Sequence, residues 1–156
     1  MIREPVNAAS VPAEEGRTIY PPPFAAQVAG RIKRKLGDYF GLANFGVNLT
    51  RLAPGSVSAL LHHHAKQDEF IYVLEGTPTL VLDDTDYLLQ PGDCFGLPAG
   101  SGVASQVVNR SEAPVLILEI GDRTPDDEVV YPEDDLHAVQ EADGSWRLTH
   151  KDGRPY

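Results

Sequence analysis

A 22-residue segment that runs from Gly55 to Gly76 constrains this chain more than any other feature. It contains His62, His64 and Glu69. Successive side chains of an extended strand point to opposite faces, so the two histidines would share one face. Their Cα atoms would lie roughly 6.5–7 Å apart, within reach of one ion held by ring nitrogens at about 2.1 Å. Two imidazoles and one carboxylate, with positions left open, are a ligand set that iron, manganese and zinc sites use.

Glu69 can join the two histidines only if the chain turns before it. It follows His64 by five positions, so on an unbroken strand its side chain would face away. The intervening residues 65–68 are polar and have the right length for a hairpin loop. In this arrangement His63 points away from the site as a surface or interface residue, and Asp68 faces solvent.

From about Phe45 to Gly121 the chain shows short apolar runs broken by turn residues, a pattern that predicts an all-β domain. Turn-forming pairs such as Pro54-Gly55 and Pro91-Gly92 separate the runs. The eight predicted strands are 45–52, 57–64, 69–75, 79–82, 87–89, 93–97, 105–108 and 115–120. Eight short antiparallel strands in one small domain favour a sandwich or a jelly roll.

The two ends of the chain lack this pattern. Residues 1–36 are rich in proline, alanine and charge, and we expect an irregular arm that wraps the domain, with a short helix near residues 24–36. Residues 37–121 would form the core of a barrel. Residues 122–156 turn acidic and irregular and would pack on the barrel as a C-terminal extension. A final hairpin is expected at Asp143-Gly144, between segments 138–141 and 145–150.

Composition limits the class of partner. The chain has 156 residues, enough for one domain, and a formal net charge of −10, which does not favour nucleic acid or an anionic membrane. Its one basic cluster, residues 31–35, has no interleaved aromatic side chain and is typical of a solvated turn or helix face. No apolar run approaches the roughly 20 residues of a membrane span, and the first ten residues lack the apolar stretch of a signal peptide. We therefore predict a cytoplasmic protein with no nucleic-acid or membrane partner.

Two further features bear on redox state and assembly. The lone cysteine, Cys94, suits a reducing compartment, and its setting predicts a small buried hydrophobe rather than a nucleophile. On the strand that begins at Glu69, alternation would turn Phe70, Tyr72 and Leu74 outward. Three large apolar groups on an outer face need a cover, which could be the N-terminal arm or a second subunit. We predict a homodimer.

Together these residues resemble the cupin superfamily of small jelly-roll barrels. The first cupin motif has approximately the form Gly, five residues, His-x-His, three or four residues, Glu, six residues, Gly. Only the first interval departs here, with six residues between Gly55 and His62. In the second motif, Gly92, Pro98 and Gly100 fit in register. The resemblance implies a double-stranded β-helix of the single-domain bacterial type, an RmlC-like jelly roll.

The histidine of the second cupin motif is absent. Counting forward from Gly100 places its position at Val103, and counting back from Asn109 places it at Ser105. The resemblance of this stretch to family members that read GHHLxNRS favours Ser105. The fourth ligand is therefore missing, and the Ser105 hydroxyl is a possible contact for a ligand or a bound water.

The resemblance implies that His62, His64 and Glu69 bind a divalent ion (zinc, iron, manganese or nickel) and that a small molecule binds in the barrel. One interpretation is a metal-dependent enzyme that acts on an oxygen-rich compound, with isomerase or dioxygenase chemistry. The alternative is a non-catalytic binding or sensor cupin, in which the same three side chains form a metal-free, hydrogen-bonded cluster. The sequence leaves the choice between enzyme and binding protein open.

Overall fold

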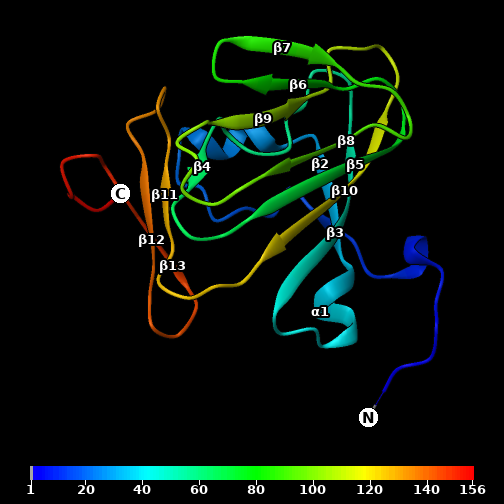
Figure 1. Ribbon diagram of the computed structural model, residues 1–156, viewed down its shortest axis with the longest axis horizontal. Helices are drawn as coiled ribbons and strands as arrows, with labels where there is room; N and C mark the ends of the chain where they lie inside the picture. The colour runs from blue at the N-terminus through cyan, green and yellow to red at the C-terminus, as the bar shows by residue number, and fades with distance from the viewer. Residues whose placement is uncertain (1) are drawn as a thin grey trace.

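The computed structural model describes residues 2–156, which form three antiparallel sheets (Figure 1). The largest sheet has six strands in the order β1 (Glu14–Glu15), β2 (Arg31–Lys35), β3 (Phe45–Leu52), β10 (Val115–Asp122), β5 (Glu69–Glu75) and β8 (Cys94–Leu97). A three-stranded sheet has the order β7 (Thr85–Leu88), β6 (Thr79–Leu82) and β9 (Ser105–Val108). A four-stranded sheet has the order β13 (Trp146–Thr149), β12 (His137–Gln140), β11 (Glu128–Val130) and β4 (His63–His64).

Helix is confined to three short segments of the described chain. These are the 3-10 turns Ala8–Ser10 and Phe24–Val28 and the α-helix α1, Leu36–Phe40. None of the helices described between residues 2 and 156 is long and apolar enough to cross a membrane. The architecture confirms the all-β jelly roll expected from the sequence.

Three sequence predictions about local structure are wrong in whole or in part. The short helix expected near residues 24–36 is present only as the 3-10 turn Phe24–Val28, because residues 31–35 form a strand. The basic cluster is not a turn or helix face, because it forms strand β2, which pairs along its whole length with β3. The predicted strand 57–64 is mostly irregular: only His63–His64 is a strand, and Val57 and His62 make isolated bridges to Val108 and Ser105 of β9. The Ser58 side chain interrupts the ladder there, since its hydroxyl accepts a hydrogen bond from the Val107 amide.

The inner face of the large sheet divides into a dry part and a wet part. The dry part packs against β6 and β9 around six fully or almost fully buried side chains: Leu52, Val73, Leu80, Val107, Val115 and Ile117. Burying each such side chain contributes about 1.5–3 kcal/mol. Elsewhere on this face of the sheet, the inward positions carry Lys33, Asn48, Glu69 and Glu119 instead, and these line a cavity. The apolar half thus holds the sheets together while the polar half is free for a ligand.

Gly76, the last glycine of the motif segment, ends β5 in a conformation that needs glycine. Its φ is +82°, and a Cβ there would meet the Pro114 carbonyl oxygen at 2.8 Å and Val115. Asn109 of the second motif is fully buried, and its side-chain amide donates to the carbonyl oxygens of Leu52 and Ala113. Both motif residues therefore hold the frame of the barrel rather than the site.

The outer face of the large sheet is apolar and only partly covered. The N-terminal arm covers the β2–β3 side, where Val11 is buried and its carbonyl oxygen accepts a hydrogen bond from Arg34. Phe70, Tyr72 and Leu74 of β5 point outward as predicted and remain 38, 38 and 36% exposed. The sequence suggested two covers for this stripe, the N-terminal arm or a second subunit, and the arm does not cover it.

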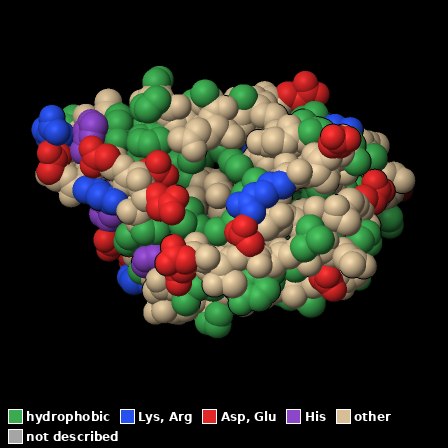
Figure 2. Space-filling view, turned by 90° about the horizontal axis from the view of Figure 1, so that it is seen from above, with side chains coloured by type: hydrophobic (Ala, Val, Ile, Leu, Met, Phe, Trp, Pro, Cys, Tyr) green, Lys and Arg blue, Asp and Glu red, His purple; other side chains and the backbone are tan. Residues whose placement is uncertain are grey.

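On the face seen from above, acidic, basic and histidine side chains gather at one end of the molecule, at the left of the view, and charged groups elsewhere lie among apolar and uncharged surface (Figure 2). At the C-terminal end, the predicted hairpin is confirmed, since β12 pairs with β13 from His137–Thr149 to Gln140–Trp146. Strand β11, which precedes it, was not predicted. It joins the C-terminal hairpin to β4 and thereby to the histidine segment. The division of the chain at residues 36 and 121 stays a prediction.

Candidate metal centre

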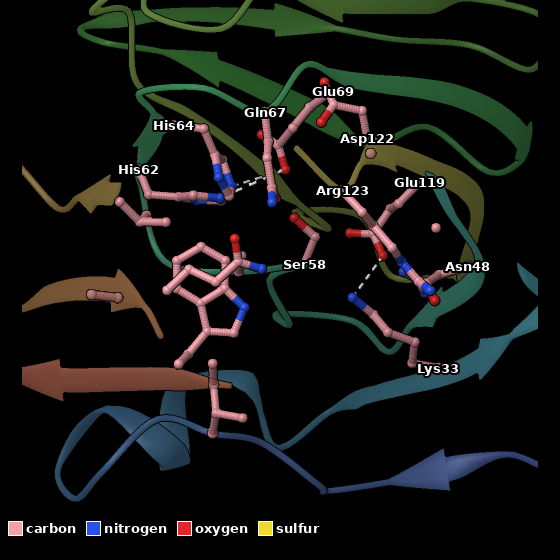
Figure 3. A pocket seen from close by; sticks show the side chains of 18 of the residues that line it. Lys33, Asn48, Ser58, His62, His64, Gln67, Glu69, Glu119, Asp122 and Arg123 are labelled. Carbon is pink, nitrogen blue, oxygen red and sulfur yellow. Dashed lines mark ion pairs between the residues drawn. The ribbon is translucent and has the colours of Figure 1, made fainter. Parts of the chain in front are cut away.

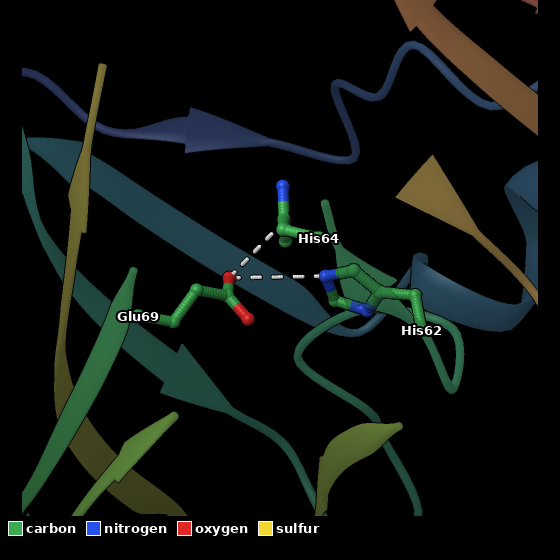
Figure 4. A group of neighbouring side chains, drawn as sticks. All are labelled: His62, His64 and Glu69. Carbon is green, nitrogen blue, oxygen red and sulfur yellow. Dashed lines mark ion pairs between the residues drawn. The ribbon is translucent and has the colours of Figure 1, made fainter. Parts of the chain in front are cut away.

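His62, His64 and Glu69 converge although they belong to different sheets (Figure 4). His62 is bridged to Ser105 of β9, His64 lies in β4, and Glu69 is the first residue of β5. The turn expected over residues 65–68 is present, but it is not a hairpin loop, because β4 pairs with β11 and β5 with β8 and β10. The chain crosses from one sheet to another, and this crossing brings the carboxylate to the histidines.

The three ligand atoms have the spacing of a metal site. One oxygen of Glu69, Oε1, lies 3.7 Å from His62 Nε2 and 3.5 Å from His64 Nε2. These separations are longer than ordinary hydrogen bonds. They are close to the value of about 3.4 Å expected between two atoms that bind one tetrahedral ion at about 2.1 Å. In the described part of the chain, this is the one group of three or more histidine, cysteine or acidic side chains that could hold an ion.

Both imidazoles are oriented by a partner behind the site. His62 Nδ1 lies 2.6 Å from the carbonyl oxygen of Leu60. A carbonyl only accepts hydrogen bonds, so Nδ1 carries the proton and Nε2 presents a lone pair to the site. His64 Nδ1 lies 2.5 Å from Asp127 Oδ2. Second partners of this kind fix the tautomer and ring orientation of metal-binding histidines.

Asp127 is the residue that sequence reasoning missed most clearly. It is fully buried, and its other oxygen accepts a hydrogen bond from the Lys66 amide at 2.7 Å. It lies 63 positions from His64 in a segment with no local pattern, so no signal in the sequence pointed to it. Its contacts tie the C-terminal segment to the turn that carries the site.

The same contacts control the charge of the site. Burial acts to raise the pKa of Glu69, but its interactions with His62 and His64 outweigh burial and hold the pKa well below its usual value. Burial acts to lower the pKa of His64, yet Glu69 and Asp127 together raise it above its usual value. Glu69 is therefore an ionised carboxylate, which is the form that binds a cation.

Ser105, the predicted replacement for the fourth ligand, is almost completely buried and lines the cavity. It exchanges both backbone hydrogen bonds with His62, at 2.8 and 3.2 Å. In such a pair the two side chains stand on the same face of the sheet. A role of Ser105 toward an ion or ligand stays a prediction.

The site opens into a cavity of about 1080 Å³ (Figure 3). Aromatic side chains stand beside the histidines. The Tyr131 ring stacks on His62 with centroids 5.7 Å apart, and Trp146 meets His64 edge-on at 6.2 Å. Tyr20, from the arm, packs edge-on against Tyr131 at 5.9 Å.

A second polar group lies across the cavity from the histidines. The Lys33 ammonium is 2.9 Å from Glu119 Oε2, and the Thr50 hydroxyl donates to the same oxygen at 2.5 Å. Both charged side chains are about four-fifths buried, with 21 and 19% exposure. The alternation of residues 115–120 turns position 119 to the same face as Val115 and Ile117, so the sequence did hold a signal for an inward carboxylate.

The remaining histidines and the cysteine lie outside this site. His63 is half-buried, does not line the cavity, and has a buried Nδ1 without a hydrogen-bond partner in residues 2–156. Asp68 is exposed, as predicted, and accepts a hydrogen bond from the Ala99 amide. His137 and His150 pair with surface carboxylates. Cys94 is exposed, so the prediction that it is a buried hydrophobe is wrong; β8 is the edge strand of its sheet, and position 94 turns to the open outer face beside Tyr72.

Comparison with known proteins identifies the family. A model of the cupin domain matches residues 48–121. A sugar phosphate isomerase of the cupin superfamily from Silicibacter pomeroyi is 40% identical and superposes with a TM-score of 0.91 over 98% of this chain and 96% of that chain. A protein from Acidithiobacillus ferrooxidans, described with reservation as a sugar phosphate isomerase, is 31% identical, with a TM-score of 0.72 over 81% of this chain and 80% of that one.

A polyketide cyclase from Streptomyces resistomycificus has a TM-score of 0.63 over 78% of this chain and 80% of its own, and its 23% identity shows a common fold alone. The comparison with curated protein sequences finds no significant match. The matched region contains His62, His64, Glu69 and Ser105, and the match to the protein from Silicibacter pomeroyi extends through both ends of the chain. The chain therefore belongs to the cupin superfamily.

Proposed function

We propose that this protein is a metal-dependent cupin that isomerises a small sugar phosphate or a related phosphorylated hydroxy-carbonyl compound. The observation that carries the proposal is the convergence of His62 Nε2, His64 Nε2 and Glu69 Oε1 on one point at the wall of the cavity. Their spacing and their oriented lone pairs fit a divalent ion: zinc, iron, manganese or nickel. A bound ion would act as a Lewis acid on a carbonyl or hydroxyl oxygen of the ligand.

Isomerisation also requires a group that moves a proton between neighbouring carbon atoms. Glu119 is the candidate, because Lys33 and Thr50 hold its Oε2 and leave Oε1 free to accept a proton. It lies on β10 opposite Ile71, one inward position along from Glu69 on the neighbouring strand. Inward side chains in such a diagonal relation lie about 7–8 Å apart, which leaves room for a small ligand between them.

The choice of isomerisation over oxygen-dependent cleavage is supported by the two relatives at 40 and 31% identity, whose descriptions name sugar phosphate isomerases.

The proposal includes a cytoplasmic homodimer. The exposed stripe Phe70, Tyr72 and Leu74 supports the dimer. The single cysteine of the chain supports a reducing compartment such as the cytoplasm.

The test is a panel of aldose and ketose phosphates incubated with metal-loaded protein in deuterium oxide and followed by proton NMR. We expect interconversion of at least one pair, with solvent deuterium entering the carbon next to the carbonyl. Glu119→Gln should slow the exchange by about 10²–10⁴-fold while the metal content stays unchanged. Glu141→Gln is the matched control, because Glu141 also lines the cavity but pairs with Arg147 at its surface. Fully metal-loaded protein that converts no member of the panel would contradict the proposal.

A second candidate is a non-catalytic binding or sensor cupin with a metal-free site. The observation that favours it is Ser105, which offers no imidazole where the second motif has its histidine. In that case the negative charge of Glu69 would be stabilised by His62 and His64 alone. Protein that is stabilised by a sugar phosphate, without metal and without turnover, would support this candidate over the first.

A further inference from the structure

One cation at the cavity lacks an acidic partner. Four of the five lysine and arginine side chains that line the cavity pair with carboxylates: Arg17 and Lys35 with Glu14, Lys33 with Glu119, and Arg123 with Asp38. The fifth, Arg31, has no carboxylate within ion-pair distance anywhere in residues 2–156. Its Nη1 donates to the carbonyl oxygen of Ser58, which carries no net charge.

Strand β2 aims this cation inward. Alternation turns Arg31, Lys33 and Lys35 toward the cavity, while Ile32 and Arg34 line a separate shallow groove on the outer face. Arg31 is half-buried there. A guanidinium has five N–H donors, and the bond to Ser58 uses one of them. A partly buried cation with unused hydrogen-bond donors destabilises the fold unless an anion binds to it.

Arg31 is linked to the metal centre by contacts through Ser58 and Tyr20. Its partner Ser58 precedes His62 by four residues and stands between the histidines and Lys33 in Figure 3. The guanidinium also lies near Tyr20: burial raises the pKa of the Tyr20 phenol, and the charge of Arg31 opposes that rise. Tyr20 packs on Tyr131, which stacks on His62, so these contacts lead from Arg31 to the metal ligands.

We propose that Arg31 binds the phosphate group of the ligand whose other end lies at His62, His64 and Glu69. The planar fork of a guanidinium matches the paired oxygens of a phosphate. This assignment rests on the proposed function for the identity of the ligand. Lys33 does not substitute for Arg31, because Glu119 already neutralises it.

The experiment titrates metal-free protein with inorganic phosphate and measures binding by phosphorus NMR and calorimetry. The net charge of −10 keeps unspecific anion binding low, so a single site should stand out. We expect one site of about millimolar affinity, weakened at least about tenfold by Arg31→Met. Arg17→Met is the matched control and should change the affinity by less than about twofold, because Arg17 already pairs with Glu14 and is 78% exposed. Acetate should bind at least about tenfold more weakly than phosphate.

Three results would overturn the assignment. They are absence of phosphate binding by the wild-type protein, equal phosphate affinity in wild type and Arg31→Met, and equal affinity for acetate and phosphate. If Arg31→Met unfolds, Arg31→Gln takes its place, since Gln keeps a donor for the Ser58 carbonyl oxygen. The titration uses no metal, so its outcome is separate from that of the proposed function. A His62→Ala variant that binds no metal should still bind phosphate.

Discussion

At the scale of the residue, the site depends on groups placed behind the ligand atoms. Asp127 is fully buried and holds His64 through its Nδ1, so it fixes the ring orientation of one ligand. The types of the ligands, two imidazoles and a carboxylate, were predictable from their spacing on one segment. Asp127 was not predictable, because it reaches His64 only when the following strand, β11, pairs with β4.

Asp127→Asn should weaken metal binding by about 10–100-fold, because an amide neither holds the imidazole as firmly nor raises its basicity. Calorimetric titration of the metal-free protein with zinc measures the change. Asp126→Asn is the control, since Asp126 is exposed and asparagine tolerates its positive φ of 59°. Equal zinc affinity in the wild type and Asp127→Asn would show that Asp127 only supports the fold.

Ser105→His should tighten metal binding, because it would supply the imidazole that the second motif lacks. We expect a gain of about tenfold, which corresponds to about 1.4 kcal/mol. The same zinc titration measures it, with Ser105→Leu as a control for added bulk without a ligand atom. An affinity in Ser105→His no better than in the wild type would place the fourth position elsewhere, such as Val103.

At the scale of the element, strands with clear alternation were predictable to the residue. The bounds predicted for four strands agree with β3, β5, β6 and β9. Strand β2 was missed because its inward positions are charged, and an inward charge hides the apolar alternation of a strand. For the segment 57–64 a strand was predicted where the chain is mostly irregular. Its residues favour a strand, but its hydrogen bonds form isolated bridges and a contact to a side chain in place of a continuous ladder.

Lys33→Met tests the polar part of β2. It would leave Glu119 in the cavity with Thr50 as its remaining partner, and we expect a loss of about 1–3 kcal/mol in the free energy of unfolding. Urea denaturation measures this loss. Lys35→Met, which removes a more exposed partner of Glu14, should cost less than about 0.5 kcal/mol. Equal losses in the two variants would mean that the Lys33–Glu119 pair is no more than a surface contact.

At the scale of the whole molecule, the uncovered stripe Phe70, Tyr72 and Leu74 predicts self-association through the large sheet. We expect light scattering at micromolar concentration to give twice the chain mass of 17.0 kDa. Tyr72→Glu should give the monomer mass, because it places a charge in the centre of the apolar face. Leu88→Glu is the control, since Leu88 is 70% exposed on β7, outside this sheet. A wild-type monomer would contradict the prediction.

The central claim is that His62, His64 and Glu69 hold a divalent ion, and the metal content of the purified protein tests it most directly. The protein is expressed in medium supplemented with zinc, iron, manganese and nickel and is measured by inductively coupled plasma mass spectrometry. We predict about one equivalent of one metal in the wild type and loss of that metal in the double variant His62→Ala, His64→Ala. Less than about a tenth of an equivalent in the wild type, or equal content in the double variant, would contradict the claim.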